Sequence, residues 1–412
     1  MLLSKSSSFI FLLVLVVAIV LLSGCGGSNQ SNAAPDITSQ VQGIVNDAPI
    51  QGGTVTLYKF DTGQKNDLGI LGTAKTDDQG HFSMTIKGYW GPVDVEITGG
   101  SYIDDATNAV VNVDSGQYLS AVKNINPGEN IGSLTITPLT TLAAGIAQGK
   151  INKGMAISSA IDDSNSMISQ LLGIKDILST VPEKLTVGKI NFSESAEYGL
   201  LLAGLSQMAS QISGVNGAKL PRVTSIQLAD AMADDALDGI LDGKQNGLQI
   251  SFGSYTLDSY NYRSKLCQAA VLFLSNPNNL SGLGWNDVIN SLNSIANATS
   301  FLFPSSDGAK PIDGNPPVVT LSYTQISLTL YSITAQATDD LSGIASLTLT
   351  PSYSSPVQGQ PGNTSTITLT YDLTTIPLHS SYSFTVVAID KAGNRTPVSS
   401  PTYINCYSCI TR

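Results

Sequence analysis

The chain has 412 residues, and a single hydrophobic core rarely grows beyond about 250–300 residues, so the length predicts two or three domains. Hydrophobic residues make up 42% and charged residues 12%, about half the usual ~25%, which excludes a chain that is disordered along most of its length. The net charge of −11 excludes the basic surface that a nucleic-acid-binding protein needs. Two histidines and four cysteines leave few ligands for a transition metal.

The first residues predict export. Lys5 precedes an uncharged apolar run of 14 residues, Phe9 to Leu22. A membrane-spanning helix needs about 20 such residues, so this run has the length of a signal-peptide core. Leu22-Ser23-Gly24-Cys25 follows directly and resembles the lipobox of bacterial lipoproteins. The resemblance implies a signal peptide over residues 1–24, cleavage between Gly24 and Cys25, and lipidation of Cys25. An ordinary signal peptide with a chance cysteine, or an uncleaved anchor, is the alternative.

A lipoprotein of this kind is held in the cell envelope by its acyl chains, palmitate among them. Two or three chains anchor a protein stably, whereas one does not. Gly26 follows the lipidated residue. Resemblance to other lipoproteins then implies sorting to the outer membrane or cell surface where the host has an outer membrane. The remainder of residues 25–40 is small and polar, which predicts a lipidated tether with a reach of roughly 20 Å.

Residues 41–123 alternate apolar and polar side chains between turn residues, a pattern typical of an antiparallel β-sandwich. The stretch from Val41 to Tyr58, followed by Thr76-Asp77-Asp78-Gln79-Gly80-His81-Phe82, resembles a carboxypeptidase regulatory-like domain. That family has a seven-stranded prealbumin-like fold and accompanies peptidases without being one. We expect a tight hairpin over residues 77–80, with Gly80 free to take a positive φ.

Residues 124–304 change to a helical period. Thr137-Pro138 predicts an N-cap and first turn, and Thr224 with Gln227 forms a capping-box pattern. Five to seven helices are expected in an all-α bundle, with Tyr262–Leu274 at its centre because that segment is apolar nearly all round. The run at 137–142 resembles helical inserts of bacterial surface lipoproteins, which implies no activity.

Residues 305–317 predict a linker, since Pro316-Pro317 cannot join a regular strand ladder. Residues 318–405 alternate again and predict a second sandwich. Within them, residues 339–344 (Asp-Asp-Leu-Ser-Gly-Ile) and 388–394 (Ala-Ile-Asp-Lys-Ala-Gly-Asn) resemble the paired signatures of bacterial Ig-like surface domains. The resemblance implies an adhesive or spacer module. Residues 406–412 form a tail that contains two cysteines.

The sequence contains no recognisable catalytic motif. His81 and His379 fall in different predicted domains, which disfavours a shared zinc site. The Cys406–Cys409 pair lacks a following histidine, so it is no c-type haem site. A pair of carboxylates for glycoside hydrolysis stays open, with four aromatic residues as the local candidates to flank a cleft. These candidates are Tyr89, Trp90, Tyr102 and Tyr118.

Acidic residues at strand ends could hold Ca²⁺, which prefers hard oxygen ligands. The favoured neighbourhood is Asp339, Asp340, Asp390 and Asn394, because strand-end carboxylates of a sandwich often meet at one pole. Residues 242–253 resemble a calcium loop more weakly, since Lys244 stands where a ligand belongs. Turn and helix-end solvation is the alternative explanation for the acidic residues at 242–253.

Three cysteines remain after Cys25. Cys406 and Cys409 are neighbours and are expected to form a disulfide or remain free in an exposed tail. Cys267 lies in the apolar helical segment, where a cysteine behaves as a small hydrophobe, so it is expected to stay reduced.

Together these observations predict a multi-domain α+β protein: an N-terminal antiparallel sandwich, a central helical domain and a C-terminal Ig-like sandwich. The favoured function is a lipid-anchored envelope protein with a non-catalytic binding, adhesion or scaffolding role, whose partners are the membrane and a protein or glycan ligand. One alternative is a carbohydrate- or peptide-binding lipoprotein that serves an envelope machine. The other is a hydrolase with its site in the helical domain.

Overall fold

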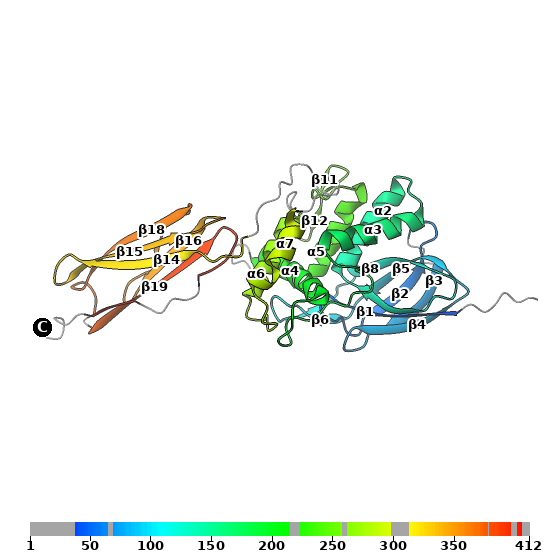
Figure 1. Ribbon diagram of the computed structural model, residues 1–412, viewed down its shortest axis with the longest axis horizontal. Helices are drawn as coiled ribbons and strands as arrows, with labels where there is room; N and C mark the ends of the chain where they lie inside the picture. Colours follow the sequence, from blue (N-terminus) through cyan, green and yellow to red (C-terminus); the bar gives the residue numbers. More distant parts are fainter. Residues whose placement is uncertain are drawn as a thin grey trace, which may run out of the picture. The chain divides into compact units, whose positions relative to one another are not determined.

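The computed structural model describes residues 38–64, 69–214, 223–257, 262–297, 313–377, 379–396 and 402–405 (Figure 1). The predicted signal peptide and most of the predicted tether, with Cys25, lie outside these residues. So do most of the predicted linker and the Cys406–Cys409 tail. The last three residues of the predicted tether, 38–40, instead begin strand β1 (Thr38–Val45).

The first part of the described chain forms two facing sheets and a short hairpin. One sheet has the strand order β4-β1-β9, and the other has the order β3-β2-β5-β8. The hairpin pairs β6 with β7. The strands are β1 (Thr38–Val45), β2 (Thr54–Lys59), β3 (Ile70–Lys75), β4 (His81–Lys87), β5 (Gly91–Thr98), β6 (Ser101–Ile103), β7 (Val110–Asn112), β8 (Tyr118–Ile125) and β9 (Ile131–Ile136).

Two glycines allow close approaches in this sandwich. Gly80 takes a φ of +78°, as expected, and a Cβ there would lie 2.5 Å from the Val45 carbonyl oxygen. The turn that contains it is not the predicted hairpin, because the strands on either side, β3 and β4, belong to different sheets. At Gly43 a Cβ would lie 2.1 Å from the Leu134 carbonyl oxygen, where β1 runs parallel to β9. The sequence pattern had placed the start of the helical region at residue 124. Strand β9, which pairs with β1, instead extends the sheet as far as Ile136.

The helical region begins as the capping signals predict. Thr137 caps α2, Pro138 occupies its first turn, and Thr224 with Gln227 forms the capping box of α5. The helices are α2 (Pro138–Asn152), α3 (Ile157–Leu172), α4 (Glu194–Gly214), α5 (Ser225–Asp235), the 3₁₀ turn η2 (Ala236–Asp238), α6 (Tyr262–Leu274) and α7 (Trp285–Asn297).

The sequence pattern had suggested a purely helical region, but the structure contains short strands here as well. Two short hairpins lie between η2 and α6, formed by β10 (Lys244–Gln245) with β11 (Leu248–Gln249) and by β12 (Ser251–Phe252) with β13 (Tyr255–Thr256). Their strands are two residues long, too short to show a period-two pattern.

The helices pack on the first sandwich and share its core. Helices α2 and α3 contact β8, and α3 also contacts β5 (Figure 1). One continuous cluster of buried apolar side chains includes Val41 and Leu57 of the sandwich, Leu139 of α2 and Phe273 of α6. The helices therefore cover a sheet face that would otherwise expose apolar side chains.

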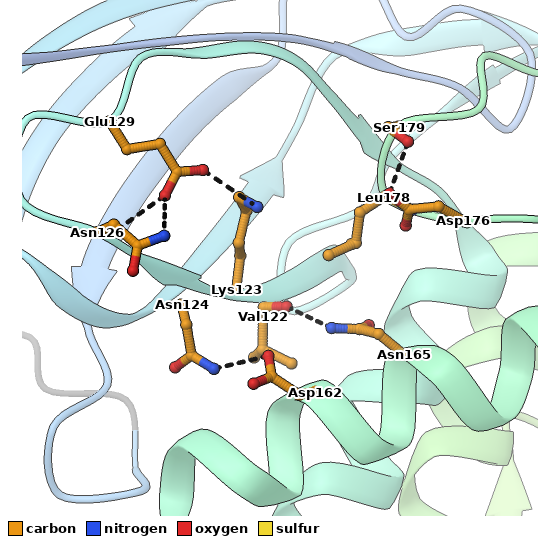
Figure 2. A network of polar contacts seen from close by, with 10 residues as sticks. All are labelled: Val122, Lys123, Asn124, Asn126, Glu129, Asp162, Asn165, Asp176, Leu178 and Ser179. Carbon is orange, nitrogen blue, oxygen red and sulfur yellow. Dashed lines mark hydrogen bonds and ion pairs between the residues drawn. The ribbon is translucent and has the colours of Figure 1, made fainter.

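Polar contacts fix α3 against β8. The Asn165 side-chain amide donates to the Val122 carbonyl at 2.9 Å, and the Asn124 amide donates to Asp162 at 2.8 Å (Figure 2). Asn165 is buried, so its bond satisfies a main-chain carbonyl that water cannot easily reach.

The C-terminal part forms a second sandwich with its own core. One sheet has the order β14-β15-β18 and the other β17-β16-β19-β20. The core cluster includes Ile333, Leu347, Tyr382 and Phe384. The strands are β14 (Val318–Gln325), β15 (Leu330–Thr338), β16 (Ile344–Pro351), β17 (Val357–Gln358), β18 (Thr364–Asp372), β19 (Ser381–Asp390) and β20 (Thr402–Asn405).

Within the described residues, no helix combines the length and the apolar character that crossing a membrane requires.

Candidate metal centre

Three aspartates meet at one pole of the C-terminal sandwich. Asp390 ends β19, Asp339 follows β15, and Asp313 precedes β14. One carboxylate oxygen from each lies within 4.8 Å of the others. Calcium binds oxygen at 2.3–2.6 Å, so two oxygens on opposite sides of one ion are about 4.6–5.2 Å apart. The spacing of the three aspartates therefore matches a shared hard cation.

Asp339 is held by the loop that it begins. Its Oδ2 accepts hydrogen bonds from the main-chain N–H groups of Ser342 at 2.8 Å and Gly343 at 2.7 Å. Gly343 has a φ of +77°, a conformation that glycine adopts without strain. The other oxygen, Oδ1, is buried and has no hydrogen-bond partner in the described structure. A buried carboxylate oxygen without a donor is costly unless a cation neutralises it.

Asp390 and Asn394 form the turn that follows β19. Asp390 is 1% exposed, and it accepts from the Asn394 main-chain N–H at 2.8 Å and from the Asn394 amide at 2.9 Å. Gly393 takes a φ of +97° within this turn. The turn is tied to the Asp339 loop, because the Lys391 N–H donates to the Gly343 carbonyl at 2.8 Å. The two signature segments of the Ig-like resemblance thus build one joint structure.

Asp313 brings the third carboxylate to this joint structure. It is 2% exposed, and its Oδ2 accepts from the Ser342 main-chain N–H at 3.1 Å. Its carbonyl oxygen accepts from the Asn394 amide at 2.7 Å. The segment before β14 is therefore fixed to both loops.

The cluster is electrostatically unfavourable without a counter-ion. Burial raises the pKa of Asp390, and the nearby charges of Asp313 and Asp339 raise it further, although hydrogen bonds from Asn394 oppose the change. No histidine or cysteine belongs to the group, so its chemistry favours Ca²⁺ or Mg²⁺ over zinc.

The sequence had named Asp339, Asp340, Asp390 and Asn394. The structure brings Asp339, Asp390 and Asn394 together, but Asp340 is exposed and lies outside the group. Its carboxylate instead accepts from the Asn315 amide at 3.3 Å. Asp313 was missed because it falls in the predicted linker, where no periodic pattern assigns it to a strand end.

The weaker calcium prediction at residues 242–253 has a different arrangement. Asp242 accepts from the Lys244 N–H at 3.0 Å, and Asp235 accepts from the N–H groups of Gly243 and Lys244. These carboxylates bind turn main chain, as the alternative explanation expects, and the search of the described residues finds no metal-binding group there.

The two histidines occur in different sandwiches, as the sequence predicted. His81 is in β4 beside Asp77, with Nδ1 3.5 Å from Oδ2, and His379 stacks on Tyr353 with ring centroids 4.2 Å apart. Cys267 is fully buried in α6, and burial raises the pKa of its thiol to about 12.

Of the four aromatic candidates, only Tyr118 lines an acidic cleft. This cleft of about 340 Å³ is bounded by Asp94, Glu96 and Asp234, among other residues. Beside it, burial raises the pKa of Asp230 to about 8, and the charges of Asp234 and Glu96 contribute. The other candidates lie elsewhere, since Tyr102 is buried and Trp90 is 51% exposed.

No protein-family model matches the chain, and a search of curated proteins finds no match either. The resemblances to the regulatory-like and Ig-like families therefore depend on the quoted residues alone. The structure itself shows a β-rich protein with a helical segment.

Proposed function

We propose that the protein is a lipid-anchored, non-catalytic component of a bacterial cell envelope, and that its C-terminal sandwich binds Ca²⁺ as part of an adhesive or spacer role. The cluster of Asp313, Asp339 and Asp390 carries the proposal, because three carboxylate oxygens within 4.8 Å of one another repel each other unless a cation binds between them.

The proposed ion would complete the pole of the sandwich. Asp339 Oδ1, buried and without a donor, supplies the ligand that most needs a cation. Asp313 and Asp390 each contribute one further oxygen. Ca²⁺ commonly takes six to eight oxygen ligands, so main-chain carbonyls and water would fill the positions that the three carboxylates leave open. Binding would hold the segment before β14 against the loops after β15 and β19.

Rigidity at this pole suits a module that transmits or resists force outside the cell. Calcium stabilises a folded protein according to the ratio of its free concentration to the dissociation constant, by about 2.7 kcal/mol at a hundredfold excess. The Leu22–Cys25 lipobox supports placement in the envelope. Replacing Cys25 with Ser should shift the protein from the membrane fraction to the soluble fraction or leave unprocessed precursor. A variant that stays acylated would contradict the anchor.

Isothermal titration with CaCl₂ tests the metal site. We expect one binding site in the unaltered protein, lost in Asp339→Asn and retained in Asp340→Asn. The second variant is a matched control, because it removes an adjacent charge outside the cluster. Equal loss in both variants, or no heat of binding in the unaltered protein, would contradict the proposal.

A carbohydrate- or peptide-binding lipoprotein that serves an envelope machine remains an alternative within the same class. Calorimetry against glycans and cell-wall fragments separates it from a purely mechanical role, because only a ligand-binding module should give saturable heats.

The acidic cleft favours a second candidate function, a hydrolase. A carboxyl with a raised pKa beside ionised carboxylates is the arrangement in which one group donates a proton and another acts as base or nucleophile. Asp230 on α5, whose pKa burial raises to about 8, is the candidate proton donor, and Asp94 and Glu96, which line the neighbouring cleft, are the candidates for base or nucleophile. A screen with glycoside substrates should give turnover that Asp230→Asn abolishes and that Asp238→Asn, on the neighbouring 3₁₀ turn, retains. Turnover unaffected by Asp230→Asn would exclude this site.

A further inference from the structure

Among the residues that the structure describes, β14 is an edge strand that contains no charge, proline or bulge of its own. It pairs with β15 on one side and ends the β14-β15-β18 sheet. An edge strand exposes main-chain N–H and C=O groups at every second residue, and proteins commonly guard such edges with charges, prolines or bulges. The pairing of β14 with β15 is regular over all eight residues, from Val318 to Gln325.

No charge protects this edge. Residues 314–338 contain no Asp, Glu, Lys or Arg, although the whole chain has a net charge of −11. Two edge strands of the first sandwich differ, since β3 ends in Lys75 and β4 ends in Lys87. The exposed positions of β14 and its following turn are also apolar in part. Val318 is 67% exposed, Tyr323 49%, Ile326 59% and Leu328 71%.

Strand β18, at the opposite edge of the same sheet, is polar on its exposed face. Strand β18 exposes threonines at alternate positions and directs Ile367 and Tyr371 into the core. The connection through β17 also contacts β18, and a Cβ at Gly359 would lie 3.2 Å from Ile367. The apolar and unprotected edge of the sheet is therefore β14.

From this geometry we infer that β14 is a docking edge for a second copy of the chain, paired antiparallel with its own counterpart. A partner that pairs with this edge must itself be an extended strand, because the unpaired main-chain N–H and C=O groups of β14 need main-chain partners. A neutral edge on an acidic protein gives two copies one surface where they can approach without charge repulsion.

The pattern of β14 is self-complementary. When Leu321 faces its own copy, Val319 lies opposite Tyr323 on the core side of the sheet, and Val318 lies opposite Thr324 on the outer side. Inward residues then meet inward residues, as an antiparallel pairing requires. The burial pattern along β14 alternates over its first five residues in agreement with this register. The product is a continuous sheet of six strands about a twofold axis.

Sedimentation equilibrium of residues 38–412, which form one compact unit, tests the inference. We expect reversible dimerisation that depends on protein concentration, in the micromolar range because a strand-edge interface is small. The double variant Thr320→Lys with Ser322→Lys places like charges opposite each other and should raise the dissociation constant at least about tenfold. Both positions are exposed, so the fold should tolerate the lysines.

The matched control is Thr366→Lys with Thr368→Lys, which adds the same charges to exposed positions of β18. It should leave dimerisation unchanged. A protein that stays monomeric at every concentration would overturn the inference and leave the edge to an extended segment of another protein. Equal weakening by both double variants would also overturn it, because it would reflect net charge rather than β14. Each sample is run once with calcium and once with a chelator, so that dimerisation through β14 can be distinguished from an effect of metal binding at the aspartate cluster.

Discussion

Asp105 offers a sharp test of how the first sandwich joins the helices. It follows β6, is 7% exposed, and accepts from the Thr186 hydroxyl at 3.4 Å. Burial raises its pKa from 3.8 to about 7; the charge of Lys184 opposes the rise, and that of Asp104 adds to it. Asp104 in turn accepts from Ser206 of α4 at 2.8 Å. These carboxyls therefore lie where sandwich and helices meet.

The sign of the pH effect follows from the raised pKa. The folded state keeps the Asp105 proton to higher pH than the unfolded state, so this group's contribution to the free energy of unfolding falls between about pH 4 and pH 7 and is level above that. At 1.36 kcal/mol per pH unit, the ionised group costs the folded state about 4 kcal/mol. The Asp105→Asn variant has no ionisable group at this position. Its free energy of unfolding should exceed that of the unaltered protein by about 2–4 kcal/mol at pH 8 and should be almost equal to it at pH 4.

Urea unfolding at both pH values, followed by circular dichroism, measures the difference. Asp78→Asn is the control, because Asp78 is exposed in the turn between β3 and β4. A stability difference for Asp105→Asn that is the same at pH 4 and pH 8, or a variant that is less stable at pH 8, would refute the reasoning.

Three further predictions concern single contacts. Asn165→Ala removes the buried hydrogen bond to the Val122 carbonyl and should lower the free energy of unfolding by about 1–3 kcal/mol; an unchanged melting temperature would contradict it. Gly80→Ala should destabilise by at least about 1 kcal/mol, because φ is +78° and a Cβ would clash with the Val45 carbonyl; chemical denaturation that shows no loss would count against this turn geometry. Cys267 should react with a thiol reagent only after unfolding, since it is buried and its thiol pKa is about 12; rapid labelling of the native protein would show that α6 opens.

Local signals in the sequence predicted local structure well. The capping patterns at Thr137 and at Thr224 with Gln227 begin helices where expected, because each cap involves residues only three positions apart. The positive φ of Gly80 follows the same logic, whereas the predicted hairpin was wrong because the strands around the turn pair with other partners. Strand alternation also predicted strands in the C-terminal part, where the described residues form β14 to β20, since half-buried strands show a period of two.

Long-range features could not be predicted in the same way. The parallel pairing of β9 with β1 joins segments about 90 residues apart, and nothing in either segment specifies its partner. The core shared by the sandwich and the helices could not be predicted for the same reason, because it also joins segments that are far apart in the sequence. Asp313 joins the aspartate cluster because the chain before β14 turns back on the loops, whereas Asp340, adjacent to Asp339, points its carboxylate to Asn315. Being next to Asp339 in the sequence is therefore a poor guide to membership of the cluster.

A crystal structure grown with excess calcium tests the central claim most directly. The account predicts anomalous density at the pole of the C-terminal sandwich, 2.3–2.6 Å from one oxygen each of Asp313, Asp339 and Asp390, with Asp339 Oδ1 among the ligands. Density absent from this position in well-ordered crystals, with the three carboxylates kept together by protons or water alone, would contradict it.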